Sequence, residues 1–189
     1  MSGETSSNPE DITPFADQLF FTAKTSSGDR ELFSSDGTPD GTGLFADLRS
    51  SGPSFPKELT AVGSRLFFTA IDDSGQRLLH STVGDESVVT TFTVGPAGSG
   101  VLPKDLISFA DRLFFTAETT GGQRELFVSD GTTAGTTLFT DLSGSQSSDP
   151  GSLTIVGDSL YFVATTAAGG RGLWVTDGSV AGTVVVPEA

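Results

Sequence analysis

The sequence predicts an all-β protein, and within that class a β-propeller of four 47-residue blades, each a four-stranded antiparallel sheet. The main observation is a repeat without insertions or deletions. Three residue types recur every 47 positions: Arg30, Arg77, Arg124 and Arg171; Pro9, Pro56, Pro103 and Pro150; Leu19, Leu66, Leu113 and Leu160. In addition, no stretch has helical periodicity. A repeat of roughly 40–50 residues is typical of propeller blades.

The repeat also predicts the domain organisation. We expect a flexible N-terminal tail, 1–8, followed by a single repeat domain, 9–189. The predicted blades are 9–55, 56–102, 103–149 and 150–189.

Within a block, apolar runs alternate with turn residues, as expected for an antiparallel meander. A tight turn at Ala110 and Asp111 joins the first two predicted strands of the third block, and the Gly-rich segment 119–122 joins the next two. A longer polar link, SGSQSSDPGS, leads to the following block. The predicted strands are 105–109, 113–117, 125–129 and 137–142.

The second strand of each block favours a propeller over a sandwich or a β-solenoid. Its sequence is LFFTA at 19–23, 66–70 and 113–117 and LYFVA at 160–164. Apolar and aromatic residues therefore stand on both faces of the strand, so both faces of each sheet are expected to be covered. Blades stacked side by side provide that cover, whereas each sheet of a sandwich has one exposed face.

The four blocks also form a doubled pair. Between residues 15–48 and 109–142, 24 of 34 positions are identical. A doubled pair favours an even number of blades. Four blades can close a ring within one chain, or two chains can form an eight-bladed dimeric ring, because an open end would leave strand edges unpaired. In the second case the protein is an obligate homodimer.

Composition excludes several functions. The 24 acidic and 10 basic residues give a formal net charge of -14, which repels nucleic acid and anionic lipid surfaces. With no cysteine and one histidine, thiolate chemistry, sulfur-based zinc sites and histidine clusters are excluded. The first residues lack the pattern of a signal peptide, and no run of about 18 apolar residues predicts membrane insertion. The opening Met followed by a Ser-rich tail suggests a domain taken from a longer protein.

Three segments resemble a known family. RELFSSDGTPDGT at 30–42, RELFVSDGTTAGT at 124–136 and RGLWVTDGSVAGT at 171–183 resemble the bacterial repeat family named for its ELWxxDGT signature. Trp174 occupies the aromatic position of the signature, where the other repeats have Phe33, His80 and Phe127. The resemblance implies a propeller-like binding or scaffold module in an exported or surface protein, with an extracellular or cell-surface location. It supplies no catalytic residues.

The second repeat departs most from the signature. Its Thr82-Val83-Gly84-Asp85 replaces the Ser-Asp-Gly-Thr turn of the others. A site repeated identically in all four blades is therefore not expected.

The Asp-Gly turns are the first candidate sites. Asp36, Asp130 and Asp177 can each accept hydrogen bonds from the backbone N–H groups that follow, and Gly37, Gly131 and Gly178 supply a positive φ. This interpretation as a structural staple is favoured. The alternative is a calcium site, which would use these carboxylates and Asp40. One carboxylate per turn is few for calcium, and no cofactor is otherwise expected.

The repeated arginines are predicted to be structural, because Arg77 persists even in the divergent repeat. A guanidinium there can bond to an Asp or to carbonyl groups of an adjacent blade. His80 is interpreted as a ring packed in a strand, and Tyr161 and Trp174 as core residues. Sugar stacking would require exposed rings.

The function expected from these observations is that of a noncatalytic binding or scaffold module, not an enzyme, with a protein or glycan ligand. A lectin with one site per blade is the first alternative. A glycosidase using two carboxylates comes third, since the chain offers many acidic pairs.

Overall fold

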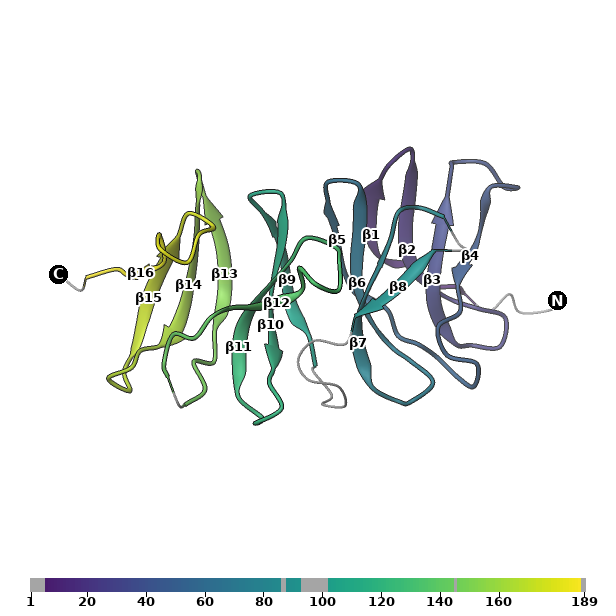
Figure 1. The fold of residues 1–189 in the computed structure, drawn as a ribbon. Helices are drawn as coiled ribbons and strands as arrows, with labels where there is room; N and C mark the ends of the chain where they lie inside the picture. Colours follow the sequence, from purple (N-terminus) through teal and green to yellow (C-terminus); the bar gives the residue numbers. More distant parts are fainter. Residues whose placement is uncertain (1–5, 86–87, 93–101, 145, 188–189) are drawn as a thin grey trace. The chain divides into compact units, whose positions relative to one another are not determined.

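The computed structural model of the chain describes residues 6–85, 88–92, 102–144 and 146–187. These residues form sixteen β-strands and no helix, as the sequence predicted (Figure 1). The described part accordingly has no helix that could span a membrane. The chain divides into two compact units, 1–91 and 92–189, and each contains two of the four sheets apart from the last residue of the eighth strand.

The first unit contains two four-stranded antiparallel meanders. The first sheet consists of β1 (Glu10–Phe15), β2 (Gln18–Lys24), β3 (Arg30–Ser35) and β4 (Thr42–Ala46). The second consists of β5 (Lys57–Val62), β6 (Arg65–Ile71), β7 (Arg77–Thr82) and β8 (Val89–Phe92), whose last residue crosses the unit boundary.

The second unit repeats this arrangement. Its first sheet consists of β9 (Lys104–Phe109), β10 (Arg112–Glu118), β11 (Arg124–Ser129) and β12 (Thr137–Thr140). The other consists of β13 (Gly151–Val156), β14 (Ser159–Thr165), β15 (Arg171–Thr176) and β16 (Val184–Val185). The four strands predicted for the third block are therefore confirmed to within a residue or two at their ends.

The N-terminal segment is tied to the first sheet where the structure describes it. Ser7 accepts a hydrogen bond from the backbone N–H of Lys24 at 2.7 Å, and the carbonyl group of Asn8 accepts one from Arg30 at 3.0 Å. Residues 1–5 of the predicted tail 1–8 lie outside the described residues.

Each sheet has two apolar faces. We call the face that carries Phe20 and Leu32 the leading face, and the opposite face, with Leu19, Phe21 and Phe33, the trailing face. The same names apply to the equivalent residues of the later sheets, each 47 positions further along the chain. Alternation along the strand assigns successive residues to opposite faces.

The core of the first unit lies between a leading and a trailing face. Phe20 and Leu32 of the first sheet share one buried cluster with Leu66, Phe68 and Ala70 of the second. Burial of a Leu or Phe side chain contributes about 1.5–3 kcal/mol, so this contact is a main source of stability. The doubly apolar strand thus allows a sheet to pack on its neighbour within the unit.

The second unit uses the same contact. Phe114 and Leu126 of the leading face of its first sheet share a buried cluster with Leu160, Phe162 and Trp174 of the next sheet. Because the two pairs pack with equivalent residues, the 94-residue doubling seen in the sequence is also a structural doubling.

A buried carboxylate links the two sheets within each unit. Glu31 is 2% exposed, and its Oε1 accepts the N–H of Ser54, 2.8 Å away, while its Oε2 accepts the Ser54 hydroxyl. Glu125 binds Ser148 in the same way, with the N–H at 3.0 Å. Burial raises the pKa of both carboxyl groups, although the bonds to serine oppose the shift. We call each pair a Glu–Ser latch.

The latch occurs only once per unit. The residues equivalent to Glu31 and Glu125 in the second sheet of each unit are Leu78 and Gly172. The latch therefore occurs at the link between the two sheets of a unit, and its glutamate is missing from the second sheet of each unit.

We expect the double variant Glu31→Gln/Glu125→Gln to weaken the pH dependence of stability. A carboxyl group with a raised pKa in the folded protein contributes most stability below its unfolded pKa, near 4.5, and loses that contribution as pH rises through the folded pKa. Glutamine can still accept the serine N–H and donate to its hydroxyl, without burying a charge. Relative to wild type, the variant should gain stability as pH rises above 4.5 in urea unfolding.

Asp17→Asn, in an exposed turn of the first sheet, is the matched control and should leave the curve parallel to that of wild type. If the stability of the glutamine double variant had the same pH dependence as that of wild type, the latch would not contain a buried charge.

Candidate functional site

The Asp-Gly turns between the third and fourth strands are held by their own side chains. Oδ1 of Asp36 accepts the backbone N–H and the hydroxyl of Thr38 at 2.9 and 2.7 Å. The Thr38 hydroxyl oxygen in turn accepts the N–H of Gly41 at 3.0 Å. The same contacts join Asp130 to Thr132, at 2.8 and 2.7 Å, and Asp177 to Ser179, at 2.8 and 2.7 Å. These bonds lower the pKa of Asp36 and Asp177.

Two glycines of each turn have separate roles. Gly131, directly after the aspartate, has a φ of +87°, which side chains disfavour. Gly135 lies under the aspartate, since an added Cβ would be 2.1 Å from Oδ1 of Asp130. The first and fourth repeats have the same pairs, Gly37 with Gly41 and Gly178 with Gly182. The role of the second glycine was not predicted from the sequence. The close approach explains why a second glycine follows each Asp-Gly pair.

The geometry gives the calcium hypothesis little support. One oxygen of Asp36 already accepts two hydrogen bonds, and Asp40 is an exposed neighbour in the same turn. Among the described residues, no group of three or more His, Asp or Glu side chains is placed to hold a metal ion. Calcium prefers six to eight oxygen ligands.

Substitution of Asp130 separates the staple from a calcium site. Asp130→Asn keeps an acceptor oxygen for Thr132 and should leave the melting temperature nearly unchanged. Asp130→Ala should lower it by about 2–4 °C, since loss of the bonds costs ~1 kcal/mol in a chain of this size. Thermal melts with calcium and with EDTA provide the measurement. A calcium-dependent rise in the wild-type melting temperature that both variants lack would contradict the staple.

The second repeat forms its turn differently. Between β7 and β8, the hydroxyl of Thr82 accepts the N–H of Gly84 at 3.0 Å and donates to the carbonyl group of Asp85 at 3.2 Å. Its Gly84 keeps a positive φ of +92°. The other repeats make the same hydroxyl bond through Ser35, Ser129 and Thr176. The second repeat therefore differs in lacking the turn aspartate, whose position is taken by Val83.

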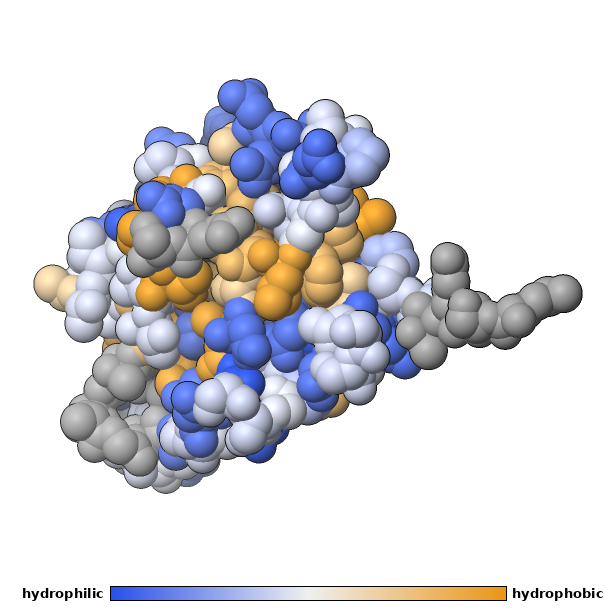
Figure 2. All heavy atoms as spheres, turned by 90° about the vertical axis from the view of Figure 1, so that its right-hand side faces the viewer, coloured by the Kyte–Doolittle hydropathy of each residue, from blue (hydrophilic) through white to orange (hydrophobic). Residues whose placement is uncertain are grey.

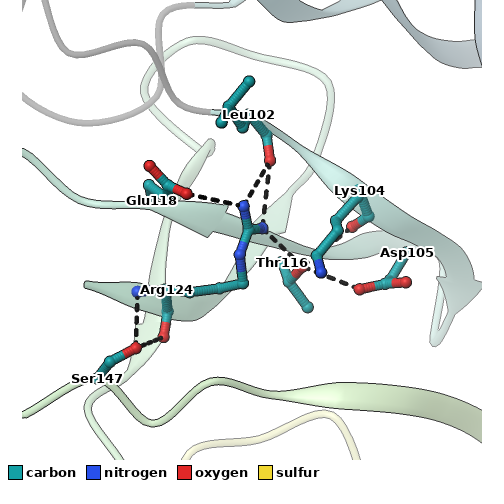
Figure 3. A network of polar contacts seen from close by, with 7 residues as sticks. All are labelled: Leu102, Lys104, Asp105, Thr116, Glu118, Arg124 and Ser147. Carbon is teal, nitrogen blue, oxygen red and sulfur yellow. Dashed lines mark hydrogen bonds and ion pairs between the residues drawn. The ribbon is translucent and has the colours of Figure 1, made fainter. Parts of the chain in front are cut away.

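The four repeated arginines begin the third strand of each sheet and bond to a carbonyl group two residues before the first strand. Figure 3 shows the third: the guanidinium of Arg124 donates to the carbonyl group of Leu102 at 3.2 Å, to Thr116 Oγ1 at 3.1 Å and to Glu118 at 3.2 Å. Arg124 thus fixes the point where the chain enters its own sheet.

The other arginines make equivalent contacts. Arg30 and Arg77 reach the carbonyl groups of Asn8 and Phe55 at 3.0 and 2.9 Å, and Arg171 reaches that of Asp149 at 3.1 Å. All four acceptor residues have a positive φ: Asn8, Phe55, Leu102 and Asp149. Each of these residues precedes a repeated proline. The arginine therefore holds a left-handed residue in place at the start of a blade.

We expect Arg124→Ala to destabilise the protein by about 1–3 kcal/mol, because it removes charge-assisted bonds at a mostly buried side chain, 13% exposed. Arg171→Ala should cost less, since its side chain is 48% exposed and its bonds compete with water. Urea unfolding of both variants provides the comparison. Equal losses, or a larger loss for Arg171→Ala, would contradict this ordering.

His80 is buried in β7, with 1% of its surface exposed. Its ring stacks on Phe68 at 5.4 Å between centroids, and Nδ1 lies 3.1 Å from Thr91 Oγ1. Burial lowers its pKa to about 4, so the ring is neutral at pH 7. A ring enclosed in this way has no access to a substrate, in line with the interpretation that it replaces the aromatic residue of the other repeats.

The rings considered for sugar stacking differ in exposure. Trp174 is 9% exposed and donates its indole N–H to the carbonyl group of Ala164 at 3.3 Å. Tyr161 is half-buried in β14. Trp174 is thus a core residue, stacked on Phe162 at 6.3 Å.

A groove of about 420 Å³ lies in the second unit, where three turns meet. Phe109 ends β9 and Ala110 begins the turn after it. Ile155 and Asp158 come from the end of β13 and the turn after it, and Asp177 comes from the Asp-Gly turn after β15. The groove combines two carboxylates with apolar surface. Of the predicted site residues it includes only Asp177.

The arrangement of these turns is fixed by close contacts. Gly178 packs on the β9–β10 turn, since a Cβ there would lie 3.2 Å from that of Ala110. Its carbonyl group accepts a hydrogen bond from Arg112, whose guanidinium lies 5.4 Å from the centre of the Phe114 ring. The groove is therefore formed on a rigid base. Sequence reasoning did not find it, because its walls come from turns up to 70 residues apart.

Comparisons with known proteins identify the fold alone. No family model and no curated protein matches the chain. Among solved structures, a TolB protein from Agrobacterium tumefaciens matches with a TM-score of 0.57 at 15% identity, over 96% of this chain and 66% of that one. TolB from Acinetobacter baumannii matches with a TM-score of 0.56 at 14% identity, over 92% and 41%. A prolyl endopeptidase matches with a TM-score of 0.60 at 16% identity, over 94% and 28%.

The chain has a β-propeller fold. The four antiparallel four-stranded sheets and the likeness to propeller proteins both show it. The chain spans about two thirds of the Agrobacterium protein and less than half of the other two. Because these proteins include a peptidase as well as TolB, the fold by itself does not assign an activity.

Proposed function

We propose that the chain is a noncatalytic binding or scaffold module, and that the groove of the second unit is where it binds a partner. The observation that carries this proposal is that the repeated polar residues are already bonded within the fold. Asp130 and Arg124, with their equivalents, are engaged in bonds within the blade and its entry, so they support the fold. The groove is formed by turns, which are the parts of a rigid scaffold that most often bind ligands.

The chemistry of the groove favours a cationic group beside an apolar one. Asp158 and Asp177 contribute carboxylates, while Phe109 and Ile155 contribute apolar surface, and Ile155 is 41% exposed. The formal net charge of -14 attracts cations over a distance. We therefore propose a protein partner that presents a lysine or arginine next to aliphatic side chains. The family resemblance adds an extracellular or cell-surface location to the proposal.

A lectin has less support from the geometry, because the groove combines residues of two different sheets and Trp174 is buried. It remains the alternative that a glycan panel would test. A glycosidase would require two carboxylates placed about a sugar-sized site, roughly 5–10 Å apart.

Peptide binding followed by NMR tests the proposal. A capped peptide with a lysine between aliphatic residues should shift the resonances of Gly157 and Asp158, and a matched peptide with glutamate should not. Asp158→Asn should weaken binding several-fold, and added salt should weaken it further. Asp17→Asn, in the β1–β2 turn of the first unit, is the control and should bind as wild type does.

Equal shifts with the lysine and glutamate peptides would contradict the electrostatic part of the proposal. Absence of shifts with either peptide, together with shifts at Gly157 on addition of a glycan, would replace it with the lectin.

A further inference from the structure

The trailing face of the first sheet, β1–β4, is more exposed than its counterparts. Leu19 is 44% exposed, whereas the equivalent Leu66, Leu113 and Leu160 are 0% exposed. Phe21 on the same face is half-buried, although its three equivalents are fully buried: Phe68, Phe115 and Phe162. The sequence of this face is that of a covered face, yet Leu19 is exposed and Phe21 only half-buried among the described residues.

Figure 2 views the molecule from the side of β1–β4. It shows apolar side chains gathered in the middle of that side with hydrophilic side chains around them. Phe21 and Phe33 of the trailing face stack on each other at 5.8 Å between centroids. An apolar centre with a polar rim is typical of a protein–protein interface.

The leading face of the last sheet, β13–β16, is exposed in the same way. Leu173 is 45% exposed, and its equivalents are 0% exposed: Leu32, Leu79 and Leu126. Val156 is 61% exposed, and its equivalents are 6–8% exposed: Phe15, Val62 and Phe109. Tyr161, also on this face, is half-buried. The last sheet therefore exposes its leading face, whereas the first sheet exposes its trailing face.

The contacts within each unit show which surface fits a leading face. In both units the leading face of one sheet packs on the trailing face of the next, through the same repeat positions. The exposed leading face of β13–β16 is therefore matched by a trailing face such as that of β1–β4.

From these matched faces we propose that the chain associates with a second copy of itself, head to tail, with β13–β16 of each chain packed on β1–β4 of the other. Leu173, Val156 and Tyr161 of one chain cover Leu19 and Phe21 of the other. Since every chain carries one face of each kind, two chains form two identical junctions and leave neither face open. This inference rests on the fold and is independent of the groove and its ligand.

Light scattering of the purified chain tests the association. Wild type should have twice the mass of one chain. Leu19→Asp and Leu173→Asp should each give a single-chain mass, because each substitution places a charge in both junctions of the dimer. Leu138 is an apolar residue of similar exposure in β12, in neither of the two sheets proposed to form the junction. Leu138→Asp should therefore keep the mass of two chains. Circular dichroism checks that each variant is folded.

Mixing the two variants tests the direction of packing. Leu19→Asp retains an intact β13–β16 face and Leu173→Asp an intact β1–β4 face, so an equimolar mixture should recover a two-chain species through one junction. Single-chain mass of wild type at about 100 µM, roughly a hundredfold above a Kd of about 1 µM, would overturn the proposal. A folded Leu173→Asp that stays dimeric would also overturn it, because like faces would then be paired.

Discussion

The packing of a leading face on a trailing face is the contact on which the rest of the structure depends. Each sheet has apolar side chains on both sides, so a sheet is most stable when both are covered. Within the two units the contact is made by Phe20 and Leu32 against Phe68, and by Phe114 and Leu126 against Phe162. Because a sheet is apolar on both sides, one face still needs a neighbour after the other face has packed. Leu19 and Leu173 lie on such faces and are exposed.

The polar residues that define the repeat serve the same packing. The turn aspartates close the third hairpin, the arginines fix the entry to the first strand, and the glutamates connect two sheets through Glu31 and Glu125. Their recurrence reflects recurring backbone problems, namely a turn with positive φ, a left-handed residue before proline and a buried connection. Variation appears at His80, which substitutes for the aromatic ring of the other repeats.

Much of the fold followed from the chain alone. The 47-residue spacing and the alternation in LFFTA were sufficient to predict four strands per block and their order. The glycine under the aspartate and the arginine–carbonyl bond were not predicted, because they depend on where the backbone folds back. Arginine was expected to reach an Asp or carbonyl groups of an adjacent blade. Arg171 does pair with the Asp149 carboxylate, and all four arginines also hold the carbonyl group that leads into their own sheet. The groove could not be predicted from the sequence, since Phe109, Asp158 and Asp177 meet only after two sheets have packed.

The sequence by itself determined the repeat unit, its strands, its turn chemistry and its pairing into 94-residue halves, because these depend on residues close together in the chain or on strict periodicity. Only the tertiary structure decided which faces are covered, which carboxylates are buried and which turns form a groove. Those properties depend on contacts between residues tens of positions apart. Side-chain alternation makes a face apolar, but only the packed neighbour determines whether that face is core or surface.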